Sequence, residues 1–295
     1  RKEGCGMTLK FFSWYGGKNR MVDIINFLIP EHRNYYEPFM GSASVLLNHR
    51  RSELEVISDL DPDLVCLMKT MADRKKGKEL SERLCSLWYG KEIYEEAMDC
   101  KRRHYRGMDD VERSVMVYIQ ITQSFNNVRK SFREGVDTWK YREDIRFHIP
   151  EVYDRMRDVK VLEMDGINVL QKIAGNENSF AFVDPPYRAE LRGKGADRVY
   201  ACELPHREQV RLLKTIRQAK CKIMLCGYKA DSGPDLYDTY LLPYGWHCYK
   251  LTEIVKACQS TKEKDMAQEF IWVNYGLPET AGVVISMKED RRILK

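Results

Sequence analysis

Short apolar runs alternate with helical patterns at both ends of this chain of 295 residues. That alternation is typical of a layered fold in which helices cover the faces of a sheet. It predicts strands at Asn34 to Glu37, Glu55 to Ser58, Val159 to Met164, Ser179 to Val183, Cys221 to Cys226, Trp246 to Leu251 and Glu269 to Tyr275. We therefore expect an α/β protein with a seven-stranded sheet.

The gap between the second and third predicted strands is far longer than a crossover helix requires. Apolar residues keep helical spacing inside it, in one group from Leu64 to Met71 and another from Val111 to Ile119. This pattern predicts an inserted, mainly helical domain at residues 69–158. The remaining core, residues 8–68 and 159–295, would then be discontinuous in sequence.

Positive charge is concentrated in the predicted insertion. Lys69 to Lys160 holds 21 Lys and Arg against 17 Asp and Glu, which accounts for most of the net charge of +5. Such a segment is a candidate surface for a polyanion, although a solvated helical surface explains the same charges. Aromatic residues interleave with the basic clusters, and Phe125 to Arg133 is polar enough to be a loop.

Several other classes of protein are not favoured. No stretch approaches the roughly 20 apolar residues of a membrane span, and Arg1 to Lys10 does not resemble a signal peptide. The nine cysteines lack Cys-x-x-Cys pairs, so we expect reduced thiols and no metal site. A cytoplasmic location is the expectation.

Two turns carry features of a nucleotide site. The segment Glu37 to Ser44 follows the first predicted strand, and Gly41 would let the backbone approach a ligand while Ser42 caps the next helix. A plain strand-to-helix turn is the alternative, because the full Gly-x-Gly-x-x-Gly spacing is missing. Asp59 ends the second strand and is a candidate for binding ribose hydroxyls. Asp61 and Asp63 are expected to cap the helix that follows.

The motif Asp184-Pro185-Pro186-Tyr187 directly follows an apolar strand. With this motif the chain resembles the Dam-type (D12 class) family of N6-adenine-specific DNA methyltransferases. Further segments match that family's motifs in the family's order: Phe12 to Lys18, Glu37 to Gly41, Ile57 to Asp59, Asp165, and Glu269 to Tyr275.

The resemblance implies a Rossmann-like methyltransferase sheet with helices on both faces and an inserted target-recognition domain. It assigns S-adenosylmethionine binding to Trp14, Tyr15, Gly16, Lys18, Glu37, Phe39, Gly41, Asp59, Asp165 and Asp184. DNA contacts would come from Phe125, Asn126, Asn127, Arg129, Lys130 and Arg133. The chain departs from the family at Ala43, where a second glycine is common, and in the loop Gln123 to Arg129. We therefore predict no recognition sequence.

The motif suits methyl transfer to an amine whose lone pair is delocalised into the adenine ring. The Asp184 carboxylate and the Pro185 carbonyl would accept the two amine hydrogens, and the prolines would fix the loop. Direct transfer without a metal or a covalent intermediate is expected. Tyr187 would stack on an adenine flipped out of double-stranded DNA, or alternatively hydrogen-bond to hold its loop.

Three other functions fit the sequence in part. An RNA adenine-N6 methyltransferase could use the same motif, although the large insertion favours DNA. A catalytically silent nucleic-acid-binding relative would not need the intact motif, and a nicotinamide dehydrogenase would have no use for it. Association with a restriction endonuclease is left open.

Overall fold

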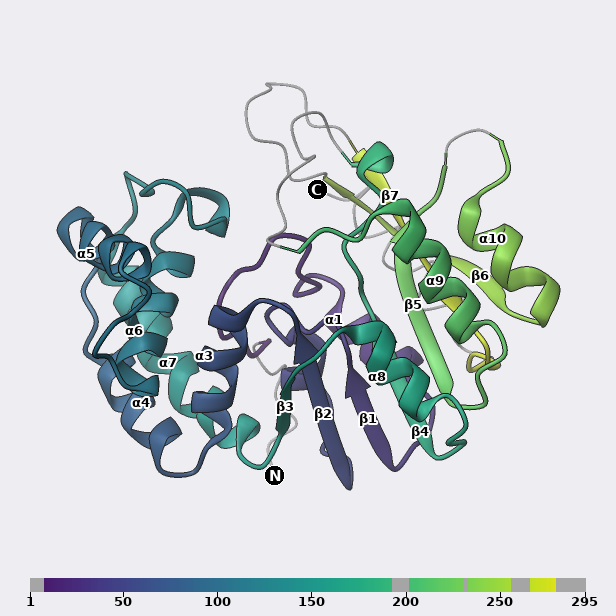
Figure 1. Cartoon of the computed structure of the whole chain (residues 1–295), viewed down its shortest axis with the longest axis horizontal. Helices are drawn as coiled ribbons and strands as arrows, with labels where there is room; N and C mark the ends of the chain where they lie inside the picture. Colours follow the sequence, from purple (N-terminus) through teal and green to yellow (C-terminus); the bar gives the residue numbers. More distant parts are fainter. Residues whose placement is uncertain (1–7, 193–201, 231–232, 256–265, 280–295) are drawn as a thin grey trace. The chain divides into compact units, whose positions relative to one another are not determined.

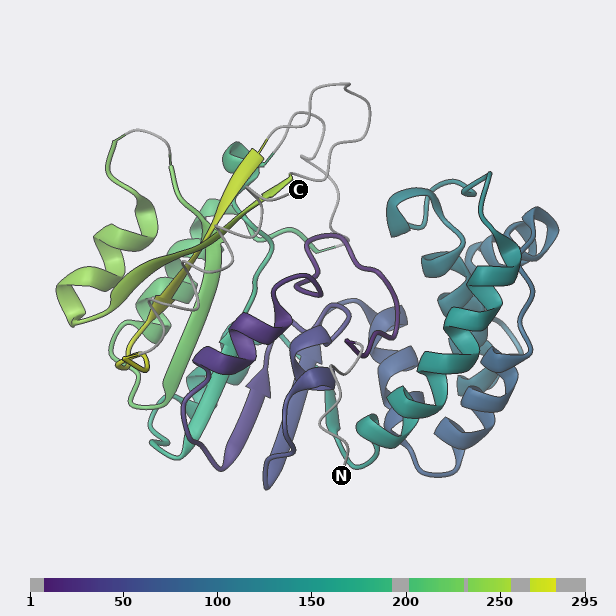
Figure 2. The ribbon, with the colours of Figure 1, turned by 180° about the vertical axis from the view of Figure 1, so that it is seen from behind.

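A computed structural model describes residues 8–192, 202–230, 233–255 and 266–279. The chain forms two compact units, each built from three segments. Unit 1 comprises Arg1–Asn26, Gly41–Arg50 and Asp61–Leu162, and unit 2 comprises Phe27–Met40, Arg51–Leu60 and Glu163–Lys295. Figure 1 and Figure 2 show the ribbon from two opposite sides.

Seven strands form one sheet, as the sequence predicts. They are β1 (Asn34–Glu37), β2 (Leu54–Asp59), β3 (Lys160–Glu163), β4 (Ser179–Val183), β5 (Lys222–Tyr228), β6 (His247–Val255) and β7 (Met266–Val273), in the spatial order β3-β2-β1-β4-β5-β7-β6. β1 pairs in parallel with β2 and β4, and β4 pairs in parallel with β5. β7 is antiparallel to both β5 and β6, which lie on either side of it (Figure 2).

Burial explains why the central strands read as continuous apolar runs. All five residues of β4 are buried, because strands covered on both faces lack exposed positions. The helices α8 (Gly166–Ile173), α9 (His206–Ile216) and α10 (Leu236–Leu241) form a common core with residues of β4 and β5 (Figure 1). Two short 3-10 turns complete unit 2, at Ala189–Leu191 and Leu242–Tyr244.

Unit 1 is mainly helical. Its helices are α2 (Ser44–Asn48), α3 (Pro62–Ala72), α4 (Lys76–Cys85), α5 (Lys91–Arg102), α6 (Asp110–Thr122) and α7 (Thr138–Met156), while α1 (Val22–Leu28) spans the boundary between the units. α6 packs against α3, α4 and α5. The apolar spacing predicted α3 and α6 correctly.

The N-terminal segment packs with these helices. The rings of Phe11 and Phe12 lie 5.5 and 6.4 Å from the ring of Tyr118 on α6. This packing groups the segment with the helices in unit 1, so the boundaries of unit 1 differ from the predicted insertion at residues 69–158. In the part of the chain that the structure describes, no helix has the length and apolar character of a membrane span.

Candidate functional site

The carboxyl ends of β1, β2 and β4 lie side by side at one edge of the sheet in unit 2. They carry Glu37, Asp59 and, one residue after β4, Asp184. Between β1 and β4 the strand order reverses, because β2 and β3 follow on one side of β1 while β5 follows β4 on the other. Open α/β sheets bind ligands outside the strand ends at such a reversal.

Close contacts fix the turn after β1. The Ser58 hydroxyl donates to the carbonyl of Pro38 at 3.2 Å, and the amide of Met40 donates to the carbonyl of Ser58 at 3.0 Å. Gly166 at the start of α8 allows this approach, since a Cβ there would lie 2.3 Å from the Pro38 oxygen. The turn between Glu37 and Met40 is thus held by β2 and α8.

The predicted acidic residues differ in what surrounds them. Glu37 is buried and accepts a hydrogen bond from the Tyr35 hydroxyl at 3.0 Å, whereas Asp59 is half-buried and accepts from the Leu60 amide at 2.8 Å. Asp165 caps α8 and pairs with Arg211 at 3.0 Å. Asp165 therefore has an evident role in starting its helix.

The backbone after Asp184 is held from α9 and from the loop before α10. Gln209 donates to the Pro186 carbonyl at 2.8 Å. The Arg188 guanidinium donates to the Asp235 carboxylate at 2.5 Å, and both side chains are buried. The motif therefore lies in a braced loop.

A third contact holds Tyr187. Its hydroxyl donates to the carboxylate of Glu269 on β7, and its ring meets the ring of Tyr228 edge-on at 4.6 Å. Burial, together with the carboxylates of Asp184 and Glu269, raises the pKa of Tyr187 well above its ordinary value. Tyr187 accordingly keeps its proton and acts as a donor.

Asp184, Cys226 and Glu269 bring one ligand atom each within 4.8 Å of one another. Carboxylate and thiolate groups are suitable metal ligands. The hydrogen bond from Tyr187 supplies one oxygen of the Glu269 carboxylate with a protein donor. Cys226 is fully buried at the end of an apolar run, as expected of a packing residue.

The N-terminal motif residues lie in unit 1. Lys18 is buried and donates to the Gly16 carbonyl at 2.9 Å, and Tyr15 is half-buried. Gly41 has a φ of 45°, and a Cβ there would lie 2.9 Å from the Trp14 ring. Both the backbone conformation and the ring therefore favour glycine at position 41.

The helix after this turn begins later than predicted. Its N-cap is Ala43, which makes no side-chain cap, so the expectation that Ser42 caps the helix is wrong. Ala43 has a left-handed φ of 50°. This conformation explains why a glycine suits this position.

The predicted DNA-contact residues form a loop in unit 1. Phe125, Lys130 and Arg133 are exposed, and the 3-10 turn Phe125–Asn127 begins the loop. Arg129 differs from its exposed neighbours, because its side chain is 9% exposed and pairs with the carboxylates of Asp61 and Asp63. The predicted DNA-contact residues thus lie in one loop, whereas the side chain of Arg129 points inward.

Sequence reasoning missed the residues that brace the motif. Gln209, Asp235 and Glu269 are distant in sequence from Asp184, and their roles depend on the folded chain. One signal was available for Glu269, since a charged residue opens the otherwise apolar run Phe270 to Val273. A buried charge in such a run requires a partner.

Comparison with known proteins identifies the family. The profile of the D12 class N6 adenine-specific DNA methyltransferases matches residues 14–252. The chain is 24% identical over 286 residues to the type II methyltransferase M1.LlaDCHI of Lactococcus lactis subsp. cremoris, covering 90% of this chain and 95% of that protein. Shorter matches link it to the DNA adenine methylases of Haemophilus influenzae (37% over 68 residues, 23% of each chain) and Vibrio cholerae (42% over 55 residues, 19% of this chain and 20% of that protein). The chain belongs to the D12 class N6 adenine-specific DNA methyltransferase family.

Proposed function

We propose that this DNA adenine methyltransferase transfers a methyl group from S-adenosylmethionine to the N6 amine of an adenine flipped out of double-stranded DNA. The observation that carries the proposal is the placement of Asp184. It follows β4 at the edge where the strand order reverses, and contacts to Pro186, Tyr187 and Arg188 brace the backbone beside it. Such bracing suits a group that must meet a reacting amine in one geometry.

The residues of unit 2 fit S-adenosylmethionine by their chemistry. The cofactor carries a sulfonium and an ammonium group besides two ribose hydroxyls, and it supplies an electrophilic methyl group when bound. Carboxylates suit all of these groups, and Glu37, Asp59 and Asp184 provide them at one edge of the sheet. We propose Asp59 as the ribose ligand.

The other cofactor assignments rest on sequence motifs. The family resemblance assigns such contacts to Phe39 and Asp165 of unit 2, and to Trp14, Tyr15, Gly16, Lys18 and Gly41 of unit 1. The close fit of Gly41 against Trp14 supports a cradle in unit 1, because that turn has no room for a side chain. We propose that all of these residues contact S-adenosylmethionine.

In the proposed mechanism the Asp184 carboxylate accepts one hydrogen of the adenine amine and the Pro185 carbonyl accepts the other. Both bonds draw the nitrogen toward tetrahedral geometry and make its lone pair available. The Pro186 carbonyl is engaged by Gln209, and neither proline has an amide hydrogen to compete for Asp184. We propose that Asp184 also takes the proton that the methylated nitrogen releases.

Base flipping is needed because the proposed substrate is an adenine in double-stranded DNA. The amine of a paired adenine is engaged with thymine, so the nucleotide must leave the helix to reach Asp184. Stacking of the extruded base on Tyr187 stays a prediction. In the structure Tyr187 is buried, with 6% of the residue exposed, and its bond to Glu269 supports the alternative role of holding the loop.

The predicted insertion is the proposed source of the DNA contacts. Its loop presents Phe125, Asn126, Asn127, Lys130 and Arg133 with side chains that are exposed or half-buried. The similarity to a type II methyltransferase supports association with a restriction endonuclease as a further proposal.

A methyl-transfer assay with labelled S-adenosylmethionine tests this function. We expect label in mixed-sequence duplex DNA, recovered after hydrolysis as N6-methyladenine. RNA of the same sequence is the matched control and should remain unlabelled. Label in RNA instead of DNA would replace the proposal with the RNA alternative.

A further inference from the structure

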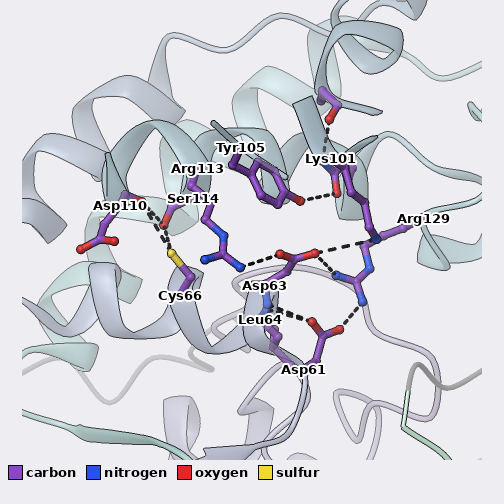
Figure 3. Close-up of polar contacts among 12 residues, drawn as sticks. Asp61, Asp63, Leu64, Cys66, Lys101, Tyr105, Asp110, Arg113, Ser114 and Arg129 are labelled. Carbon is purple, nitrogen blue, oxygen red and sulfur yellow. Dashed lines mark hydrogen bonds and ion pairs between the residues drawn. The ribbon is translucent and has the colours of Figure 1, made fainter. Parts of the chain in front are cut away.

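The side chain of Arg129 points into unit 1, although its loop carries the proposed DNA contacts (Figure 3). Its guanidinium donates to the Asp61 carboxylate and lies 3.6 Å from Oδ2 of Asp63. The same group lies over the ring of Trp14, 5.8 Å from its centroid. Arg129 is therefore engaged by the start of α3 and by the N-terminal segment.

The two aspartates that receive Arg129 are themselves fixed. Asp61 caps α3 as expected, accepting from the amides of Asp63 at 3.0 Å and Leu64 at 3.3 Å, whereas Asp63 lies inside the helix and does not cap it. Asp63 accepts from Arg113 of α6 at 2.8 Å and lies 3.8 Å from Nζ of Lys101 on α5 (Figure 3). Basic groups from two helices and the loop thus converge on two largely buried carboxylates.

The backbone of the loop requires such an anchor. Asn126, Asn127 and Arg129 have φ values of 53°, 58° and 57°, in the left-handed region. Residues other than glycine keep this conformation where the surrounding structure fixes it. The hydroxyl of Ser124 accepts from the Arg129 amide at 3.0 Å, so main chain and side chain of Arg129 are both held.

We infer that Arg129 is a positioning residue for DNA recognition and makes no phosphate contact. Its guanidinium fixes the shape of the loop by anchoring it to Asp61 and Asp63. The inference rests on the proposed function, because it assumes that this loop reads DNA. The neighbouring Lys130 is exposed and provides a matched contrast, since it keeps the role of a proposed DNA contact.

The variants Lys130→Gln and Arg129→Gln should affect methylation in different ways. Lys130→Gln removes a phosphate contact and should lower the slope of log kcat/KM against log salt by about one, measured on a long mixed-sequence duplex. Arg129→Gln should raise KM for this DNA about ten-fold or more, with kcat unchanged, because the loop that carries the proposed contacts is misplaced.

The partner of Arg129 provides the sharper test. Asp61→Asn keeps an acceptor for the cap of α3 but removes a negative charge, which by electrostatics alone would strengthen DNA binding. We expect it to raise KM for DNA, as Arg129→Gln does. The double variant should cost no more than either single change, because both disrupt the same pair. Asp61→Asn still decides the question if Arg129→Gln does not fold.

The outcomes distinguish this inference from the function on which it rests. Absence of methyl transfer by the wild-type protein would overturn both. A wild-type enzyme that methylates DNA, combined with an unchanged or lower KM for Asp61→Asn, would overturn the inference alone and make Arg129 a phosphate contact.

Discussion

The hydroxyl of Tyr187 donates a hydrogen bond to the carboxylate of Glu269, and both side chains are buried in unit 2. Because Tyr187 ends the motif that Asp184 begins, this bond ties the candidate catalytic loop to β7. It also gives one oxygen of a buried carboxylate a hydrogen-bond donor. The geometry of the loop therefore depends on a strand far along the chain.

Substitutions at Glu269 test this tie. Glu269→Gln keeps an acceptor for the Tyr187 hydroxyl and should retain most methyl transfer. Glu269→Ala removes the acceptor and should lower both turnover and stability, the latter by about 1 to 3 kcal/mol. Denaturant unfolding and methyl-transfer rates provide the measurements. Equal loss of activity in the two variants would show that the carboxylate acts otherwise than by holding Tyr187.

Tyr187→Phe tests the same bond from the other side. It retains the ring but removes the hydroxyl that donates to Glu269, so stability should fall by about 1 to 3 kcal/mol. In the Glu269→Gln background the same change should cost less, because a buried neutral amide tolerates a lost partner better than a charge does. Additive costs in this double-mutant cycle would argue against a direct interaction.

Asp59→Ala should weaken S-adenosylmethionine binding roughly ten-fold or more, since hydrogen bonds to a charged acceptor contribute about 1.5 to 3 kcal/mol. Isothermal titration calorimetry measures the affinity directly. The affinity of Asp165→Ala provides a comparison at a second proposed cofactor contact, one that also caps α8 and pairs with Arg211. Unchanged affinity in a folded Asp59→Ala protein would remove Asp59 from the cofactor site.

The buried pair of Arg188 and Asp235 should stabilise the loop. Asp235→Ala leaves a buried guanidinium without its carboxylate and should cost about 3 to 5 kcal/mol of stability.

Burial alone would raise the pKa of Asp235, but bonds from the Ala230 amide and Arg188 lower it overall. A carboxylate with a lowered pKa stabilises the fold above its ordinary pKa and loses this effect as pH falls. The difference between wild type and Asp235→Asn should thus shrink below pH 3.8. A constant difference down to strongly acidic pH would exclude this ionisation as its cause.

The sequence predicted the framework better than the contacts within it. The apolar run of β4 and the motif after it located Asp184 at a strand end, because burial on both faces has a clear sequence pattern. The partner of Tyr187 lies 82 residues away, and that of Arg129 lies 68 residues away. The packing of the helices and strands decides which distant residues come into contact. The periodicity of apolar residues in the sequence does not reveal these contacts. The sequence groups Arg129 with its neighbours in the loop, because a left-handed backbone and an inward-pointing side chain leave no trace in composition.

Single-molecule sequencing of DNA from cells that express this protein tests the central claim most directly. The wild-type protein should produce N6-methyladenine at a recurring sequence in duplex DNA. Asp184→Ala should fold but lose at least about a hundred-fold in methyl transfer, because an amine hydrogen loses its charged acceptor in the transition state. Its DNA should therefore carry almost none of the modification at matched expression. Methylation by Asp184→Ala at the wild-type level would contradict the mechanism, and unmodified adenine with the wild-type protein would contradict the function.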